Sequence, residues 1–169
     1  MAIAISTIGV KVSYAFETTA GERPTTGYRV IPQVKSTPDF NSAPDTLETT
    51  SFDNLVNKTY INGLKDYGGA MEFSVNFTQA LKDMWNNDST GVMAQWETAK
   101  TDGKGMWICV DIPNIDESAF IPVEPTALGT PALEVNSVAE TSIYFTPVGD
   151  VVWEADPTYA SDSQEVSAQ

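Results

Sequence analysis

The sequence has no histidine, and this absence removes several kinds of chemistry at once. Histidine is the commonest general base, the usual metal ligand and the partner of the nucleophile in most serine and cysteine hydrolases. The chain also has a single cysteine, Cys109, which rules out an internal disulfide, and nothing marks an oxidising compartment. We therefore expect a protein that is not an enzyme and that holds neither a metal ion nor another cofactor.

Basic residues are scarce as well. Nine Lys and Arg stand against 23 Asp and Glu, which gives a formal charge of −14 and a pI near 4.1. A protein gains affinity for a phosphate backbone by placing Lys and Arg against it, and no cluster of them occurs in the sequence. The composition argues against nucleic-acid binding. Surplus acid is typical of an abundant protein that must remain soluble.

Long apolar runs are also missing. No stretch approaches the roughly 20 apolar residues of a membrane-spanning helix, and residues 1–9 lack the basic and apolar parts of a signal peptide. A soluble, unprocessed chain without membrane association is expected. A length of 169 residues favours a single domain.

The patterns that are present are mainly those of strands. Residues 8–16, 70–78 and 106–112 alternate apolar with polar or small side chains, the period of two that indicates a strand. Pro32 limits a further strand around it to a sheet edge or a bulge. The weaker strand signals lie at 28–34, 45–52, 117–123 and 138–146.

After residue 78 the period changes to that of an amphipathic helix. A polar turn at 86–90 interrupts the apolar stripe, and we expect the main helix at about 90–101. The stripe indicates core packing, and its residues are Leu81, Met84, Trp85, Val92, Trp96 and Ala99.

About six or seven strands and one helix predict a mainly β fold. We expect an antiparallel β-sandwich or open barrel with one packed α-helix, formed by residues 1–155, and a flexible acidic tail at 156–169. Residues 52–67 show neither period and are predicted to be a long connection between two strands. This connection is too apolar for a free linker, so we expect it to dock against another surface.

Three segments of the sequence resemble the central part of the major tail tube proteins of siphophages, the bacteriophages with long non-contractile tails. They are residues 44–50 (PDTLETT), 60–68 (YINGLKDYG) and 72–75 (EFSV). The later layout is similar too, with an aromatic-bearing helix and a closing pattern at 134–147. The resemblance covers most of residues 28–153 and rests on patterns of residues, without a catalytic signature.

The resemblance implies a structural virion protein of the tail, made and assembled in the cytoplasm of the bacterial host. Hexameric rings of such proteins stack into a tube whose inner β-barrel is shared among subunits, and DNA passes through without specific binding. The implied partners are further copies of the chain and other tail proteins, such as terminator and tape measure proteins. A ring of six copies would carry a formal charge of −84, six times −14, and an acidic lumen would repel DNA.

The resemblance also implies roles for particular residues. The polar face of residues 70–78 would line the lumen, together with the polar residues of a strand paired with it. The connection at 52–67 would be the loop that stacks one ring on the next. The expected lumen residues are Thr46, Glu48, Thr50, Glu72, Ser74 and Asn76, and the expected stacking residues are Leu55, Tyr60, Ile61, Leu64 and Asp66.

Other functions remain open at this point. A tube subunit of a contractile tail or a secretion system would have a similar fold and would also form rings. A carbohydrate-binding β-sandwich is a second alternative, suggested by Trp107, Trp153 and the tyrosines. An enzyme is the weakest, because the carboxylates of Asp111, Asp116 and Glu117 lie close together in a chain that is rich in acid.

Overall fold

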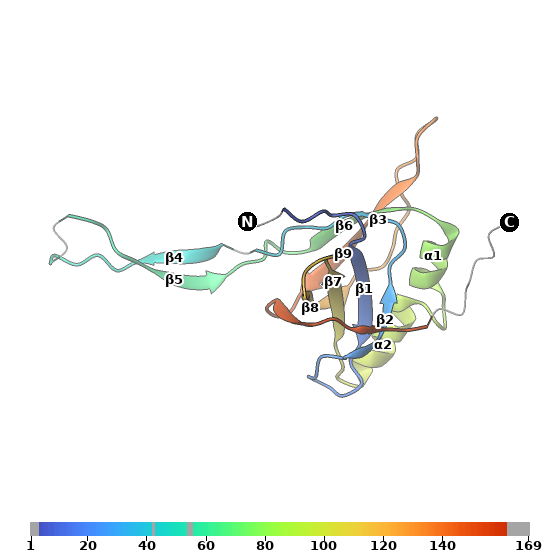
Figure 1. The fold of residues 1–169 in the computed structure, drawn as a ribbon, viewed down its shortest axis with the longest axis horizontal. Coiled ribbons are helices and arrows are strands. Elements are labelled where there is room, and N and C mark those ends of the chain that lie inside the picture. Colours follow the sequence, from blue (N-terminus) through green and yellow to red (C-terminus); the bar gives the residue numbers. More distant parts are fainter. Residues whose placement is uncertain (1–3, 42, 54–55, 162–169) are drawn as a thin grey trace.

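The structure is a computed structural model that describes residues 4–41, 43–53 and 56–161, and eleven strands and two helices lie in these ranges (Figure 1). The elements are, in chain order, β1 (Lys11–Phe16), β2 (Thr26–Val30), β3 (Val34–Ser36), β4 (Pro44–Glu48), β5 (Tyr60–Lys65), β6 (Met71–Asn76), α1 (Gln79–Asn86), α2 (Val92–Thr101), β7 (Met106–Asp111), β8 (Glu117–Pro125), β9 (Glu140–Pro147), β10 (Val152–Ala155) and β11 (Thr158–Tyr159).

Nine of the strands form one curled sheet in the order β11-β2-β1-β7-β8-β9-β6-β3. β10 pairs with the first part of β8, at 117–120, while β9 pairs with its last part, at 123–125. All pairs in this sheet are antiparallel except β11 with β2. β4 and β5 form a separate two-stranded sheet. The predicted mainly β, antiparallel and open fold is confirmed.

Apolar residues cover both faces of the central strands β1, β7 and β8. Side chains alternate between the faces of a strand, so Tyr14 and Ile108 join the main cluster beneath the helices, while Ala15 and Cys109 join a smaller cluster on the opposite face. The smaller cluster also contains Tyr28. Cys109 is a small buried residue, and its burial raises the pKa of the thiol to about 11.

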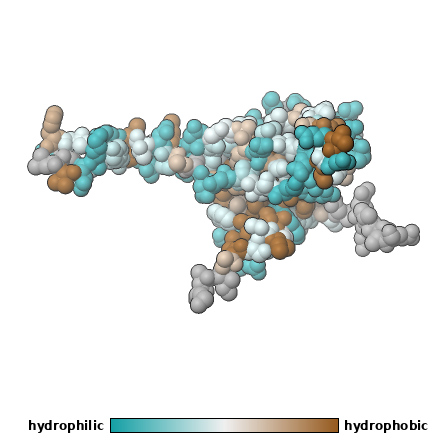
Figure 2. All heavy atoms as spheres, turned by 90° about the horizontal axis from the view of Figure 1, so that it is seen from above, coloured by the Kyte–Doolittle hydropathy of each residue, from teal (hydrophilic) through white to brown (hydrophobic). Residues whose placement is uncertain are grey.

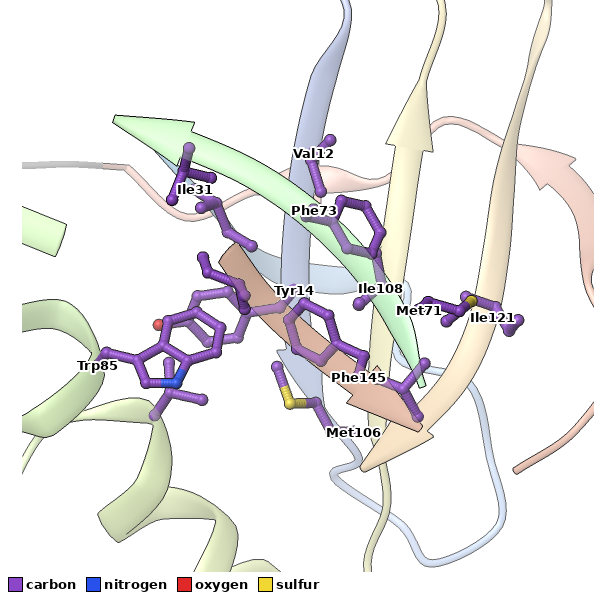
Figure 3. Packing of buried hydrophobic residues seen from close by; sticks show 14 of the residues in the cluster. Val12, Tyr14, Ile31, Met71, Phe73, Trp85, Met106, Ile108, Ile121 and Phe145 are labelled. Carbon is purple, nitrogen blue, oxygen red and sulfur yellow. The ribbon is translucent and has the colours of Figure 1, made fainter. Parts of the chain in front are cut away.

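Two helices pack on the sheet, where one was expected. α1 begins because the hydroxyl of Thr78 accepts a hydrogen bond from the Leu81 amide at 3.1 Å, which caps the first turn. Its Trp85 ring lies against Tyr14 and Phe145, at centroid distances of 6.5 and 5.6 Å (Figure 3). The predicted stripe therefore forms the core, but its first half is a helix of its own.

Four further details differ from the expectations. The expected strand at 28–34 is divided into β2 and β3, with Pro32 between them. The connection at 52–67 contains β5, whose residues show no period of two because both of its faces are exposed. β10 lacks an alternating sequence and had not been predicted. The expected tail at 156–169 begins with β11, which pairs with β2, and residues 162–169 lie outside the described residues.

Glu17 joins three parts of the body through one largely buried carboxylate. Its oxygens accept hydrogen bonds from the Gly21 amide at 2.7 Å, the Gly105 amide at 2.9 Å and the Trp107 indole at 2.9 Å. Burial by itself raises the pKa of Glu17, but the three hydrogen bonds outweigh it and leave the pKa below its ordinary value of 4.5.

A carboxyl group whose pKa is lower in the folded than in the unfolded chain stabilises the fold at pH values above its unfolded pKa. This stabilisation is lost as the pH falls through the pKa of the group in the folded chain. Glu17→Gln places an amide donor among three N–H donors, so we expect it to lower the free energy of unfolding by about 2–3 kcal/mol at pH 7. Urea denaturation at pH 7 and at pH 3 measures the effect. The difference from the unaltered chain should shrink at pH 3, whereas Glu22→Gln on the adjacent loop should change little at either pH.

Candidate self-assembly surfaces

The hairpin of β4 and β5 projects from the body as a long arm, on the side opposite to the two helices (Figure 1). Its register pairs Leu47 with Ile61 and Glu48 with Tyr60. Residues opposite each other share a face and successive residues alternate. Leu47 and Ile61 therefore lie on one face of the arm, whereas Glu48 and Tyr60 lie on the other.

Within the described residues, the arm is not covered by the body. None of the residues 44–53 and 56–66 belongs to either apolar cluster of the body. Figure 2 shows hydrophobic side chains at the far end of the arm, where nothing of the body reaches them. Exposed apolar patches are typical of interaction surfaces. The exposed large apolar residues of the arm are Leu47, Phe52, Val56, Tyr60, Ile61 and Leu64.

The root of the arm is attached to the body through Asp150. One carboxylate oxygen of Asp150 accepts a hydrogen bond from the Tyr67 hydroxyl at 2.8 Å and an ion-pair contact from the Lys65 ammonium at 3.2 Å. The hydrogen bond from Tyr67, with that from Lys65 and its charge, holds the pKa of Asp150 below its ordinary value. Gly68 and Gly69 follow with positive φ, which turns the chain into β6.

The second candidate surface is polar and lies on the body, on the outward face of β3, β6, β9 and the end of β8. The register places Glu72 beside Tyr144 and Glu124 beside Thr146 on this face. Glu72 accepts a hydrogen bond from Ser142, and Lys35 forms an ion pair with Glu140. We call this surface the acidic face. Its side chains are those of Lys35, Glu72, Ser74, Asn76, Glu124, Glu140, Ser142, Tyr144 and Thr146.

The structure separates the six expected lumen residues into two groups. Glu72, Ser74 and Asn76 lie on the acidic face, whereas Thr46 and Glu48 lie on β4 and Thr50 follows it on the arm. The expected pairing of the two strands is wrong, because β4 pairs with β5 and β6 pairs with β3 and β9. That these six residues line a lumen stays a prediction.

Of the expected stacking residues, Tyr60, Ile61 and Leu64 are exposed on the arm, and Leu55 lies outside the described residues. The Asp66 carboxylate accepts a hydrogen bond from the Gly68 amide at 2.8 Å, so it belongs to the root of the arm. Sequence reasoning missed Asp150 and Glu124. Their positions become evident only from contacts or pairings between distant parts of the chain.

Two of the residues that suggested other functions, Asp111 and Trp107, have hydrogen-bond partners within the chain. Asp111 accepts a hydrogen bond from the Tyr159 hydroxyl at 2.8 Å, and the Trp107 indole donates to Glu17. Trp153 is half exposed beside a shallow cavity. In the described ranges, no three His, Cys, Asp or Glu side chains come close enough together to hold a metal ion. Neither described helix has the length and apolarity to cross a membrane.

The sheet ends in short strands on both sides. β3 has three residues and β11 has two, and each pairs with one neighbour within the chain. An edge strand has unpaired backbone groups that another chain can use. The edge at β3 borders the acidic face.

No model of a protein family matches the chain, and no curated protein matches it significantly. The fold, however, is shared with a solved structure. The chain is similar to a chain in the tail of an empty GTA particle, determined by helical refinement with C6 symmetry. The TM-score is 0.51 and the sequence identity is 15%, and the similarity covers 86% of this chain and 96% of the other. This likeness extends over nearly the whole of the fold.

The Asp150 contacts predict that the arm has a preferred direction. Asp150→Ala removes both contacts, so the arm should move more freely while the body stays folded. Spin labels at Asn57→Cys on the arm and Ser89→Cys on the body would give a broader distance distribution in the variant, measured by pulsed electron resonance. Cys109 is buried and does not compete for the label.

Asp116→Ala makes the same change of charge on the turn between β7 and β8 and should leave the distribution unchanged. An equally narrow distribution in Asp150→Ala would show that other contacts hold the arm.

Proposed function

We propose that the chain is the structural subunit of a phage-like tail tube. The observation that carries the proposal is the arm, which exposes apolar side chains that the chain's own body does not cover. The fold similarity to a tail particle with C6 symmetry supports it. Copies of the chain form rings of six, and the arm of each subunit reaches the next ring. The protein is then a component of the virion tail with no enzymatic role.

Within a ring, the sheet continues from one subunit to the next. The edge at β3 supplies unpaired backbone groups to a neighbour, and a closed ring leaves no free edge. The acidic face then lies toward the axis. It carries three carboxylates, of Glu72, Glu124 and Glu140, and one ammonium, of Lys35. A lumen with this excess of negative charge lets DNA slide without adhering.

The polar face of the arm, with Thr46, Glu48 and Thr50, extends this lining between rings, while Leu47 and Ile61 on its other face are free to make the stacking contact. Stacking of rings gives the tube its length. Terminator and tape measure proteins are the expected partners at the ends and inside, and DNA passes through to the host.

A tube subunit of a contractile tail or a secretion system is the second candidate, because the fold and the arm serve stacking there equally well. The carbohydrate-binding alternative has less support, since one of its two tryptophans, Trp107, is hydrogen-bonded to Glu17 inside the body.

The arm should be dispensable for folding and necessary for tubes. Replacing residues 46–63 by a short Gly-Ser linker leaves both apolar clusters intact, so cooperative thermal unfolding should persist. Negative-stain electron microscopy of concentrated protein should show tubes for the unaltered chain and none for the shortened one.

A matched pair of variants separates the two faces of the arm. Leu47→Ser with Ile61→Ser should impair growth, whereas Thr46→Ala with Asn62→Ala on the opposite face should not. Normal tubes from the shortened chain would refute the stacking role.

Glu72→Lys should assemble, because its side chain is exposed, yet it should slow the passage of DNA. A positive ring in the lumen attracts phosphate, and we expect delivery of DNA by particles with this variant to fall by about tenfold or more at low ionic strength. Glu22→Lys, on the loop after β1, makes the same charge change away from the acidic face and should have no effect. Equal delivery by both variants would place Glu72 outside the lumen.

A further inference from the structure

The end of the body opposite to the arm carries a shallow groove. It lies where α1, α2 and the connection between β8 and β9 meet, and its volume is about 390 Å³, open to solvent. We call it the helix groove. It is lined by Asn86, Asn87, Asp88, Met93, Ala94, Glu97 and Ala127.

The chemistry of the groove is apolar with an acidic border. Met93, Ala94 and Ala127 contribute apolar side chains, and the charged residues of the lining, Asp88 and Glu97, are both acidic. Met93 and Ala94 are only half buried, although they lie on a helix whose Val92 is fully buried. The groove is large enough for an aromatic ring and a small aliphatic side chain.

The far part of the arm carries exposed apolar side chains and one ammonium, together with the carboxylate of Asp53. Phe52 and Val56 are almost completely exposed there. Lys58 lies close to them in sequence, and its ammonium contacts the Glu48 carboxylate at 3.3 Å with both side chains well exposed. An exposed ion pair of this kind contributes little, so Lys58 can exchange Glu48 for another carboxylate at low cost.

The positions of the two surfaces also fit. The arm and the helices lie at opposite ends of the long axis of the molecule (Figure 1). A contact between opposite ends of identical subunits repeats in one direction and builds a stack. Another cavity with an apolar lining, of about 280 Å³, is lined in part by residues 37–41, close to the root of the arm at Pro44. It lies near the arm's own root, where a head-to-tail neighbour is less able to reach it.

We infer that the far part of the arm, with Phe52, Val56 and Lys58, docks into the helix groove of a second copy in the adjacent ring. The two apolar side chains occupy the lining of Met93, Ala94 and Ala127, and Lys58 faces the carboxylates of Asp88 and Glu97. This inference rests on the proposed tube function and identifies the surface that receives the arm.

Engineered cysteines test the contact directly. Val56→Cys on the arm is combined with Ala127→Cys in the helix groove, and Cys109 is buried and does not interfere. Oxidation of assembled protein should give a ladder of covalent multimers on a non-reducing gel. The matched control combines Val56→Cys with Thr37→Cys at the other cavity, and it should give no ladder.

A ladder from the control but not from the groove pair would overturn the inference and leave the tube function standing. Covalent dimers alone from the groove pair would also overturn it, since a head-to-tail contact continues beyond two. If the unaltered chain forms no tubes at any concentration, the proposed function fails and the inference fails with it.

A charge exchange supplies an independent readout. Lys58→Glu should slow tube growth by roughly tenfold, because it places a carboxylate against Asp88 and Glu97. Adding Glu97→Lys should restore growth, whereas adding Glu134→Lys, on the exposed connection after β8, should not. Restoration by both or by neither would contradict the inferred contact.

Discussion

The two strands of the arm, β4 and β5, cannot bury their own apolar side chains, and the proposed assembly follows from this limit. A hairpin is a single layer, and a single layer has no second surface against which to place its apolar side chains. The arm of β4 and β5 nevertheless carries Leu47, Tyr60, Ile61 and Leu64 in exposed positions. Burying one such side chain fully contributes about 1.5–3 kcal/mol. The single chain does not realise this stabilisation on the arm, and the proposed assembly would supply it.

The body supplies the rigidity that such an arm needs. β8 lies at its centre, pairing with β7 along one side and with β10 and then β9 along the other. Apolar clusters on both faces leave little freedom for the sheet to change its curvature. Asp150, on the connection between β9 and β10, accepts hydrogen bonds from Lys65 and Tyr67 and thereby links the root of the arm to the body. An arm with a preferred direction loses less conformational entropy when it binds.

The sequence predicts those parts of the fold that have a periodic signal. The alternation in β6 and the stripe of Leu81, Trp85 and Trp96 mark the core correctly, because one face of each element is buried. In β7 the alternation separates two apolar clusters, one on each face of the sheet. The exposed residues of β5 have no such signal. The pairing of β4 with β5 instead of β6 is likewise absent from local patterns, since strand partners are chosen by the whole chain.

The candidate surfaces, too, could be predicted only where the local sequence carries a signal. The apolar excess of the connection at 52–67 predicts that it docks against another surface, and this stays a prediction. The structure shows that Phe52, Val56, Tyr60, Ile61 and Leu64 are exposed there. Contacts between residues far apart in the sequence could not be predicted. An example is the hydrogen bond between Tyr67 and Asp150, which are 83 positions apart. The acidic face is a further example, because Glu124 reaches it through the pairing of β8 with β9.

The separation of arm and helices to opposite ends has a consequence for any filament that the chain builds. Subunits that repeat in one orientation give the filament a direction, and its two extremities differ in chemistry. In the proposed tube, one extremity displays uncovered arms and the other displays unoccupied helix grooves. A protein that binds the arms at one extremity would not fit the helix groove at the other, so the two ends of the proposed tube would be closed by different partners.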